Sequence, residues 1–421
     1  MAWEAWKTSG FERKLLAIAG SALWCVLLLA AAWMMELNEP YLPAAIAGGM
    51  IFYLRSAPKI AEQVAWLAFS VGFAWIVHFP DTERSWKLAG FSVAALFGLG
   101  AFLILGWRWL WSEPSARRKA YAMLTPAIGL VFFVFSIRRA LSLANLLHPK
   151  TYDLYLYAFD GSFGFQPSFL MGQAMAVSVL LRFAARLAYF SLPFVMALVY
   201  ALRLPKGSER PSWDMIILFL LAGLGGLALY NIVPAAGPAY VFGTSFPWQA
   251  LPYGSLPRLF LEPVSVARNI PRNAIPSLHM AWAVLLYWNT KGLSLTLRIF
   301  LAAYVALTVV STLGTGEHYF VDLVAGIPFA LFVQAVVSPG HRVSFSRRAV
   351  VAAAGMAMTL AWLLLARFGV KAMLVSPILP WSLATAICLA VFVLNARFAG
   401  AVGSSSSNAP ERPAALGQEA I

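Results

Sequence analysis

The chain is poor in charged residues and in cysteine. Only 11% of its 421 residues are Asp, Glu, Lys or Arg, whereas soluble globular domains carry roughly 25%. This scarcity excludes an ordinary soluble domain. The only two cysteines, Cys25 and Cys388, lie far apart inside apolar runs. A disulfide is therefore not expected, and no cluster of Cys and His has the spacing of a metal site.

Acidic residues are scarcer than basic ones, with 17 Asp and Glu against 31 Lys and Arg and a net charge of +14. In a soluble protein this excess would favour nucleic-acid binding. Here the basic residues lie in short loops between apolar runs, so membrane topology and anionic lipid head groups explain them better. In addition, 61% of residues are hydrophobic and the mean hydropathy is +0.75. We expect an integral protein of the cell or inner membrane, with the lipid bilayer as its partner and no nucleic acid.

Long apolar runs follow one another along the chain. About twelve of them span or nearly span a bilayer, which takes roughly 17–25 residues each. Because helices satisfy their own backbone hydrogen bonds in lipid, we expect an all-α polytopic helix bundle. We interpret the first run as a retained span, with a cleaved signal peptide as the alternative. The predicted segments are residues 15–35, 41–54, 60–79, 88–111, 120–141, 174–201, 213–234, 277–290, 296–313, 319–337, 349–366 and 376–395.

Positive charge in the loops orients this bundle. Clusters at 117–119, 203–210 and 342–348 fall on the same side as the N-terminus when the spans are counted. Because Lys and Arg are enriched in cytoplasmic loops, both termini are expected in the cytoplasm. Residues 396–421, rich in Ser and Pro towards the end, are expected to form a disordered cytoplasmic tail. The same count places His279 and His318 on the outer face.

Two histidine motifs stand beside long apolar helices. The first is Pro276-Ser277-Leu278-His279; the second begins at Ser311 and ends with His318-Tyr319-Phe320-Val321-Asp322. His318 and Asp322 are four residues apart, which places them on one face of a helix. Asp322 can then fix the tautomer of His318 and leave its other nitrogen free to attack phosphorus. His279 can protonate the departing oxygen and later take a proton from the incoming hydroxyl.

Phosphate binding near these motifs calls for donors and positive charge. Ser277 can donate to a phosphate oxygen, and Arg272 and Arg268 lie just upstream. Arg186 and Arg182 lie inside a predicted span, where a charge should face a polar cavity or snorkel to the surface. We expect one of these two to line the phosphate site. No metal or cofactor is needed.

Two long connections separate the predicted spans around these motifs. Residues 142–173 are expected to include an amphipathic helix in the membrane interface. Within them, Asp153 and Asp160 are expected to be cap or interface residues rather than catalytic ones. Residues 235–274, rich in Pro, Gly and aromatics, lie directly before the first histidine motif and are expected to be functional.

Together the motifs resemble the signatures of the type-2 phosphatidic acid phosphatase superfamily. Pro276 to His279 is similar to its second signature, and Ser311, His318 and Asp322 match the spacing of its third. Within the superfamily the chain looks most like the inositol phosphorylceramide synthase (inositolphosphotransferase) branch. The details are Leu278, Thr312, the string 318–322 and the segments Tyr152-Asp153 and Pro234-Ala235-Ala236-Gly237-Pro238.

The resemblance covers about residues 120–340 and implies a six-helix catalytic core. It implies that His318 is the nucleophile, Asp322 its orienting partner and His279 the general acid and base, without a metal. The first phosphatase signature is missing, because the letters in Lys206 to Pro211 have the wrong spacing. Phosphate binding therefore falls to the arginines named above. The implied domains are spans of unknown role (1–119), a catalytic domain (120–340), further spans (341–395) and the tail (396–421).

The sequence thus predicts a membrane enzyme acting on a phospholipid or lipid phosphate through a phosphohistidine. Head-group transfer to a hydroxyl and hydrolysis share the first step, and only the second differs. The missing signature and the branch resemblance lean towards transfer. The rival interpretation is a polytopic transporter or lipid flippase that uses the His, Asp and Arg side chains for protons or anions. Such transporters show paired broken segments in two halves, and the sequence has no such symmetry.

Overall fold

The computed structural model describes residues 41–78, 86–205, 208–339 and 343–407. These residues are mostly helical, which confirms the all-α prediction. The predicted first span at 15–35, together with Cys25 and Arg342, lies outside the described residues.

The N-terminal part of the described chain consists of helices only. Gly48 separates the first two, so the predicted segment 41–54 forms two short helices rather than one span. The long helix that ends this part begins after Glu113 with Pro114 at its first position, where the missing N–H costs no hydrogen bond. The helices are α2 (Tyr41–Ala47), α3 (Gly49–Arg55), α4 (Ile60–His78), α5 (Trp86–Trp111) and α6 (Pro114–Leu147).

The middle part alternates short helices with loops. Its two strands pair antiparallel, with Lys150 opposite Ser265. The elements are β1 (Lys150–Thr151), α7 (Asp153–Gly161), α8 (Pro167–Val177), α9 (Val179–Phe190), α10 (Leu192–Arg203), α11 (Asp214–Leu229), α12 (Pro238–Phe242), η2 (Gly243–Ser245), η3 (Tyr253–Arg258) and β2 (Val264–Ser265).

The C-terminal part returns to long helices. α18 continues through Ser407, past the predicted start of the tail at 396, and residues 408–421 lie outside the described part. The helices are α13 (Leu278–Trp288), α14 (Leu295–Gly314), α15 (Phe320–Val337), α16 (Phe345–Phe368), α17 (Val370–Met373) and α18 (Ile378–Ser407).

Six of the described helices are long and apolar enough to cross a membrane, so the predicted count of about twelve is not confirmed. The predicted span at 174–201 is broken. α8 and α9 meet at an angle of 118°, because Ser178 between them has an extended backbone and caps α9 by accepting from the N–H of Leu181. If the bent pair counts as one span, the number rises to seven.

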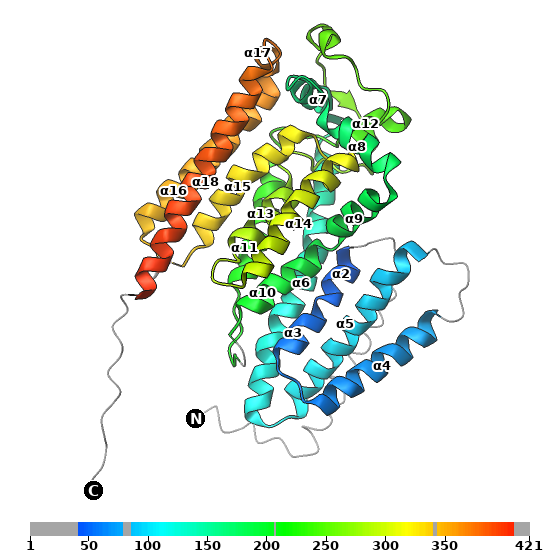
Figure 1. The fold of residues 1–421 in the computed structure, drawn as a ribbon, viewed down its shortest axis with the longest axis vertical. Helices are drawn as coiled ribbons and strands as arrows, with labels where there is room; N and C mark the ends of the chain where they lie inside the picture. Colours follow the sequence, from blue (N-terminus) through cyan, green and yellow to red (C-terminus); the bar gives the residue numbers. More distant parts are fainter. Residues whose placement is uncertain (1–40, 79–85, 206–207, 340–342, 408–421) are drawn as a thin grey trace.

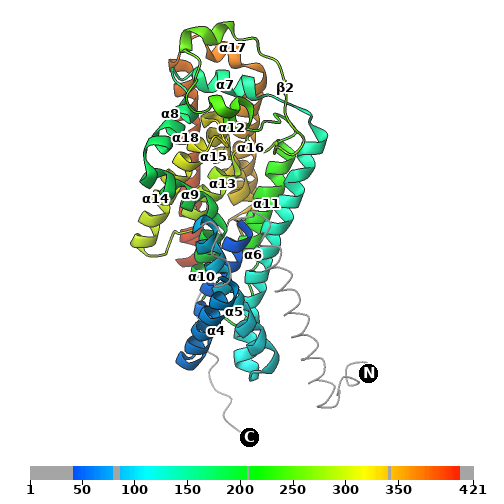
Figure 2. The ribbon, with the colours of Figure 1, turned by 90° about the vertical axis from the view of Figure 1, so that its right-hand side faces the viewer.

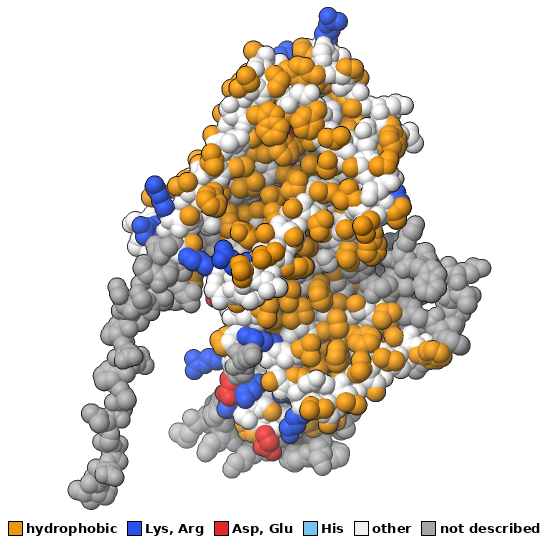
Figure 3. Space-filling view, in the orientation of Figure 1, with side chains coloured by type: hydrophobic (Ala, Val, Ile, Leu, Met, Phe, Trp, Pro, Cys, Tyr) orange, Lys and Arg blue, Asp and Glu red, His pale blue; other side chains and the backbone are white. Residues whose placement is uncertain are grey.

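The helices pack side by side along one long axis. α15, α16 and α18 lie together, and both views place α7, α12 and α17 at one end and α4 and α5 at the other (Figures 1 and 2). Figure 3 shows hydrophobic side chains over most of the visible upper and middle surface, with most visible Lys and Arg towards the lower part. This pattern suits a bundle surrounded by lipid.

Side chains of the basic clusters contact one another or helix C-termini. Arg118 pairs with Glu209 at 2.6 Å, which joins two of the predicted clusters. Arg203 donates to the carbonyl of Asn289 at the C-terminus of α13, and Arg348 to carbonyls in the last turn of α15. Cations stabilise helix C-termini. His279 lies in the first turn of α13 and His318 just before α15, so each histidine is separated from these basic side chains by the length of its helix.

The predicted interfacial helix within 142–173 is wrong. α7 is buried along most of its length and packs against α15, α16 and α17. Its two aspartates, Asp153 and Asp160, are fully buried. α7 is therefore part of the protein core that carries the histidine motifs.

Candidate active site

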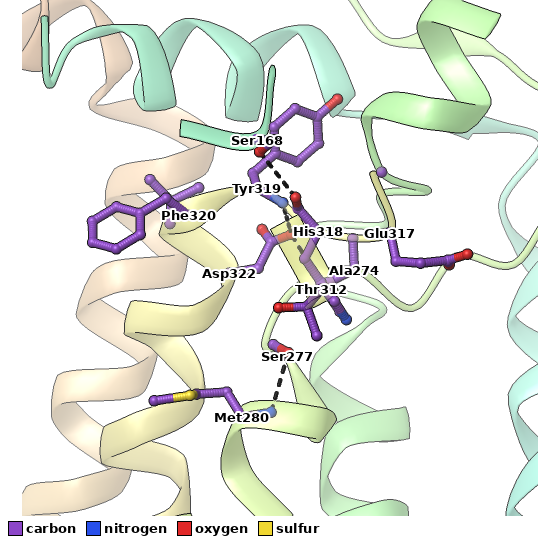
Figure 4. A network of polar contacts seen from close by, with 12 residues as sticks. Ser168, Ala274, Ser277, Met280, Thr312, Glu317, His318, Tyr319, Phe320 and Asp322 are labelled. Carbon is purple, nitrogen blue, oxygen red and sulfur yellow. Dashed lines mark hydrogen bonds and ion pairs between the residues drawn. The ribbon is translucent and has the colours of Figure 1, made fainter. Parts of the chain in front are cut away.

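His318 is held by its backbone in the loop between α14 and α15. Its N–H donates to the carbonyl of Thr312 at 3.2 Å, and its carbonyl accepts from the hydroxyl of Ser168 at 3.0 Å (Figure 4). α15 begins only at Phe320, so His318 precedes the helix on which it was expected. A histidine fixed at both backbone groups presents its ring in one direction.

The ring of His318 is oriented by a carbonyl group. Its Nδ1 lies 2.8 Å from the carbonyl oxygen of Ala274, whereas Oδ2 of Asp322 lies 3.5 Å away. Asp322 accepts instead from the N–H of Tyr319 at 2.7 Å. The predicted i,i+4 contact therefore exists as an ion-pair distance, but Ala274 makes the hydrogen bond. With Nδ1 donating to this carbonyl, Nε2 carries the lone pair, and it makes no hydrogen bond with any described residue.

Burial makes His318 a neutral imidazole. Its side chain is almost fully enclosed, which lowers the pKa of His318 to about 4, while Glu317 and the Ala274 carbonyl act in the opposite direction. The carboxylate of Glu317 accepts from the hydroxyl of Tyr240 at 2.9 and 3.0 Å, and burial raises the pKa of Glu317. A neutral ring near pH 7 is the form that can attack phosphorus.

Two buried aspartates of α7 hold the backbone around His318. Asp160 accepts from the N–H groups of Phe320 and Val321 at 2.8 and 2.9 Å, which caps α15. Asp153 accepts from the N–H groups of Ala236 and Gly237 at 2.8 to 3.2 Å. Asp160 is therefore a cap residue, whereas Asp153 binds the loop directly before α12 rather than a helix N-terminus.

The segment 234–238 connects the two motifs. The carbonyl of Ala235 accepts from the N–H of Ala274, whose own carbonyl binds His318. Gly237 has a φ of 106°, and a Cβ there would lie 2.4 Å from the carbonyl oxygen of Glu317, so only glycine fits. The two upstream segments that carried the weaker resemblance, 152–153 and 234–238, therefore meet beside the second motif.

His279 occupies the first turn of α13. Ser277 precedes the helix and caps it by accepting from the N–H of Met280, while its own N–H donates to the carbonyl of Asp322 at 2.9 Å. This last bond ties the two motifs together. The ring centroids of His279 and His318 lie 5.9 Å apart at an interplanar angle of 67°, so one phosphoryl group can contact both rings.

Aromatic side chains surround His279. Tyr189 of α9 stacks on its ring, with centroids 4.2 Å apart and an interplanar angle of 18°. The hydroxyl of Tyr41 lies 3.0 Å from Nε2 of His279. Neither tyrosine, nor the Glu317–Tyr240 pair, was predicted as part of the site. Glu317 could have been noticed from its position next to His318, whereas no sequence pattern connects Tyr41 to a residue 238 positions away.

The predicted phosphate-binding arginines are engaged elsewhere or exposed. Arg272 is fully buried and donates to the carbonyls of His148, Val266, Ala267 and Ile270, so it serves to fold the loop around it. Arg182 makes one long hydrogen bond to the carbonyl of Ala176. Arg186 and Arg268 are exposed. In the described part of the chain, no Lys or Arg forms a hydrogen bond or ion pair with either histidine.

Comparison with known families agrees with this geometry. Comparisons with curated proteins and with solved structures yield no significant match. Residues 154–336 match the family model described as the PAP2 superfamily, and both histidines and Asp322 lie inside the matched region. The match supports a phosphatase-type enzyme acting on phosphorylated substrates. The central region of this chain is therefore similar to the PAP2 superfamily.

Proposed function

We propose that the protein is an integral-membrane enzyme that acts on phosphorylated lipids through a phosphohistidine at His318. The observation that carries this proposal is the pairing of an oriented, neutral His318 with His279 at 5.9 Å between ring centroids. Nε2 of His318 is free while Nδ1 is engaged, which is the arrangement of an activated nitrogen nucleophile.

In the first step, the lone pair of Nε2 attacks phosphorus. The bond between phosphorus and the leaving alcohol oxygen breaks, and that oxygen takes a proton from His279. The phosphorylated ring of His318 then carries a positive charge, because Nδ1 keeps its proton. The carboxylate of Asp322, 3.5 Å from Nδ1, stabilises that charge. Its role is electrostatic, and the Ala274 carbonyl supplies the orientation.

In the second step, a hydroxyl group attacks the phosphohistidine. Its proton passes to His279, and the electrons of the N–P bond return to Nε2. Water as the attacking group gives hydrolysis, and an alcohol gives transfer of the phosphoryl-linked head group. The residues of the site perform the same task in both reactions.

The charge of the site favours a phosphodiester over a phosphomonoester as donor. In the described part of the chain, no basic side chain forms a hydrogen bond or ion pair with either histidine, so neither ring has a basic neighbour to compensate the charge of a phosphate. A monoester carries up to two negative charges near neutral pH, whereas a diester carries one, so the diester needs less compensation. We therefore place the protein with enzymes that transfer a phosphoryl-linked head group, as the inositol phosphorylceramide synthase-like motifs suggest.

Orientation follows from the separation of charges. The basic clusters lie at the end of α13 and α15 remote from the histidines. If that end is cytoplasmic, as enrichment of Lys and Arg favours, both termini are cytoplasmic and the site faces the outer leaflet. The site then draws its lipids from that leaflet.

The test is a lipid-panel assay on the purified full-length protein in nanodiscs. Diester donors with inositol, glycerol and ethanolamine head groups are compared with phosphatidic acid, in the presence of ceramide, diacylglycerol or water alone. We expect a new phospholipid from a diester donor with an alcohol acceptor, and loss of at least about 10⁴-fold in turnover in His318→Ala.

His148→Ala is the matched control, because His148 contacts Asn231 rather than either catalytic ring. Turnover that survives in His318→Ala contradicts the nucleophile assignment. A wild-type protein that moves lipid across the bilayer without changing it contradicts the enzyme. Phosphatidic acid as the best substrate would contradict the argument from charge.

A further inference from the structure

The N-terminal helices reach into the active site although they lie outside the region that matches the family. Tyr41 is the first residue of α2, and the matched region begins at residue 154. Its hydroxyl is 3.0 Å from Nε2 of His279. Its ring packs against Tyr189 and Phe190, with both centroid distances at 5.8 Å. Tyr41 thus joins the aromatic wall around the acid–base histidine.

α2 is held in place by close backbone packing. A Cβ on Gly48 would lie 2.5 Å from Cβ of Ala197 in α10, and one on Gly98 of α5 would lie 2.0 Å from the carbonyl oxygen of Ile46. Arg55 of α3 donates to the carbonyl of Leu204 at the end of α10. Small residues at such crossings let helices in lipid approach closely. The position of Tyr41 is therefore set by the bundle.

The contacts of His279 distinguish its two nitrogens. Nε2 faces Tyr41, whereas Nδ1 makes no hydrogen bond with any residue in the described ranges. The other groups facing the ring are Tyr189 of α9, Trp282 of its own helix and His318 from the loop before α15. None of these carries a negative charge. Among the described residues, the Tyr41 hydroxyl is thus the group placed to accept a hydrogen bond from an N–H of His279.

We infer that Tyr41 is a positioning residue for His279, supplied by an N-terminal helix that the catalytic region does not contain. The hydroxyl oxygen accepts from Nε2–H and so fixes the neutral tautomer in which Nδ1 carries the lone pair and can take up the exchangeable proton. When His279 is protonated, Nδ1–H donates its proton to the leaving oxygen, and Nε2–H remains hydrogen-bonded to the hydroxyl oxygen of Tyr41. When it is neutral, Nδ1 takes the proton of the incoming hydroxyl. Tyr41 gains and loses no proton in either step.

This inference rests on the proposed function, and its test separates the two. Tyr41→Phe removes only the hydroxyl. Tyr53→Phe is the matched control, because Tyr53 is a fully buried tyrosine of neighbouring α3 whose hydroxyl has no hydrogen-bond partner among the described residues. Both variants are compared with wild type in nanodiscs by turnover on the diester panel. ¹⁵N NMR of histidine-labelled protein without substrate provides the second measurement.

In Tyr41→Phe we expect kcat to fall by roughly tenfold to 100-fold with KM changed less than about twofold, a part of the usual contribution of general acid–base catalysis. Formation and breakdown of the phosphoenzyme should slow together, because one histidine serves both. The limb of the pH–rate profile assigned to His279 should move to lower pH, since the imidazolium form loses a hydrogen-bond acceptor and the pKa of His279 falls. The ¹⁵N resonance of His279, assigned among the five histidines with His279→Gln, should show loss of the Nε2–H tautomer.

Tyr53→Phe should match wild type in every measurement. A Tyr41→Phe variant with unchanged kcat, pH profile and His279 resonance overturns the inference. A rise in KM alone also overturns it, since Tyr41 would then contact substrate instead of His279. If wild type turns over no lipid but the His279 resonance changes as expected, the proposed function fails while the positioning role stands.

Discussion

The two histidines of the site are held in contrasting ways. His318 is fixed by main-chain groups: the carbonyls of Ala274 and Thr312 bind its ring and its N–H, and Ser168 binds its carbonyl. His279 is fixed by side chains, with Tyr189 against its face and Tyr41 at its edge. The three residues that bind His318 directly come from the family-matched region, whereas Tyr41 comes from outside it.

This difference fits the two tasks. A nucleophile must attack along one line, and the proposed nucleophile His318 lies in main chain whose N–H groups are bound by buried Asp153 and Asp160. An acid–base group must exchange a proton at one nitrogen, and the contacts of His279 with Tyr41 and Tyr189 leave Nδ1 available for this. We infer that the matched region supplies the covalent chemistry and that the N-terminal helices tune proton transfer.

The largest expected effect separates the tasks of the two histidines. In His279→Ala, phosphoenzyme should still form slowly and then accumulate, because the second step lacks its base. Turnover should fall by about 10² to 10⁴-fold. Quenched reactions with ³²P-labelled lipid measure acid-labile label on the protein. Label that appears equally in the double variant with His318→Ala would show that the roles are assigned wrongly.

A smaller effect tests whether the Ala274 carbonyl is enough to orient His318. Asp322→Asn keeps an oxygen for the N–H of Tyr319 but removes the charge 3.5 Å from Nδ1. Turnover should drop by about tenfold to 1,000-fold, less than where an aspartate bonds the histidine directly. Rapid-quench measurement of phosphoenzyme formation checks this, with the melting temperature as control. A loss of folded protein would instead make Asp322 a structural residue only.

The smallest effect concerns the hydrogen bonds by which Asp160 holds the main chain after His318. In Asp160→Asn the amide offers one acceptor oxygen to two N–H groups, those of Phe320 and Val321. Stability should fall by about 1–3 kcal/mol. Thermal unfolding in detergent measures it. Asp214→Asn, which changes an exposed aspartate in the first turn of α11, should be within about 0.5 kcal/mol of wild type. Equal stability of both variants would mean that Asp160 does not stabilise the main chain at the start of α15.

Much of the helix content could be predicted from the apolar runs. Where the described chain overlaps the predicted segments, each contains helix, because a run of apolar residues in lipid has few other conformations. Length was harder. The segment 41–54 breaks at Gly48, and 174–201 bends sharply at Ser178. Helices shielded by other helices need not cross the bilayer, so hydropathy overcounts spans.

The structure brings together the three residues that the motifs indicate, but their contacts could not be predicted. His279, His318 and Asp322 could be found from spacing, and their proximity followed from the motifs. The role of Arg272 could not be predicted from the sequence, because nothing local indicates that its guanidinium turns towards four backbone carbonyls instead of a phosphate. The hydrogen bond from His318 to Ala274 crosses 44 positions and depends on how segment 234–238 packs.

The sequence by itself determined a helical protein with apolar segments long enough to cross a membrane and two histidine motifs beside them, because hydropathy and local spacing act over a few turns of chain. The tertiary structure alone decided which nitrogen of each ring is engaged and which groups engage it. Such contacts join residues up to 238 positions apart, as Tyr41 and His279 show. They depend on how closely the helices pack, and that is a property of the whole bundle.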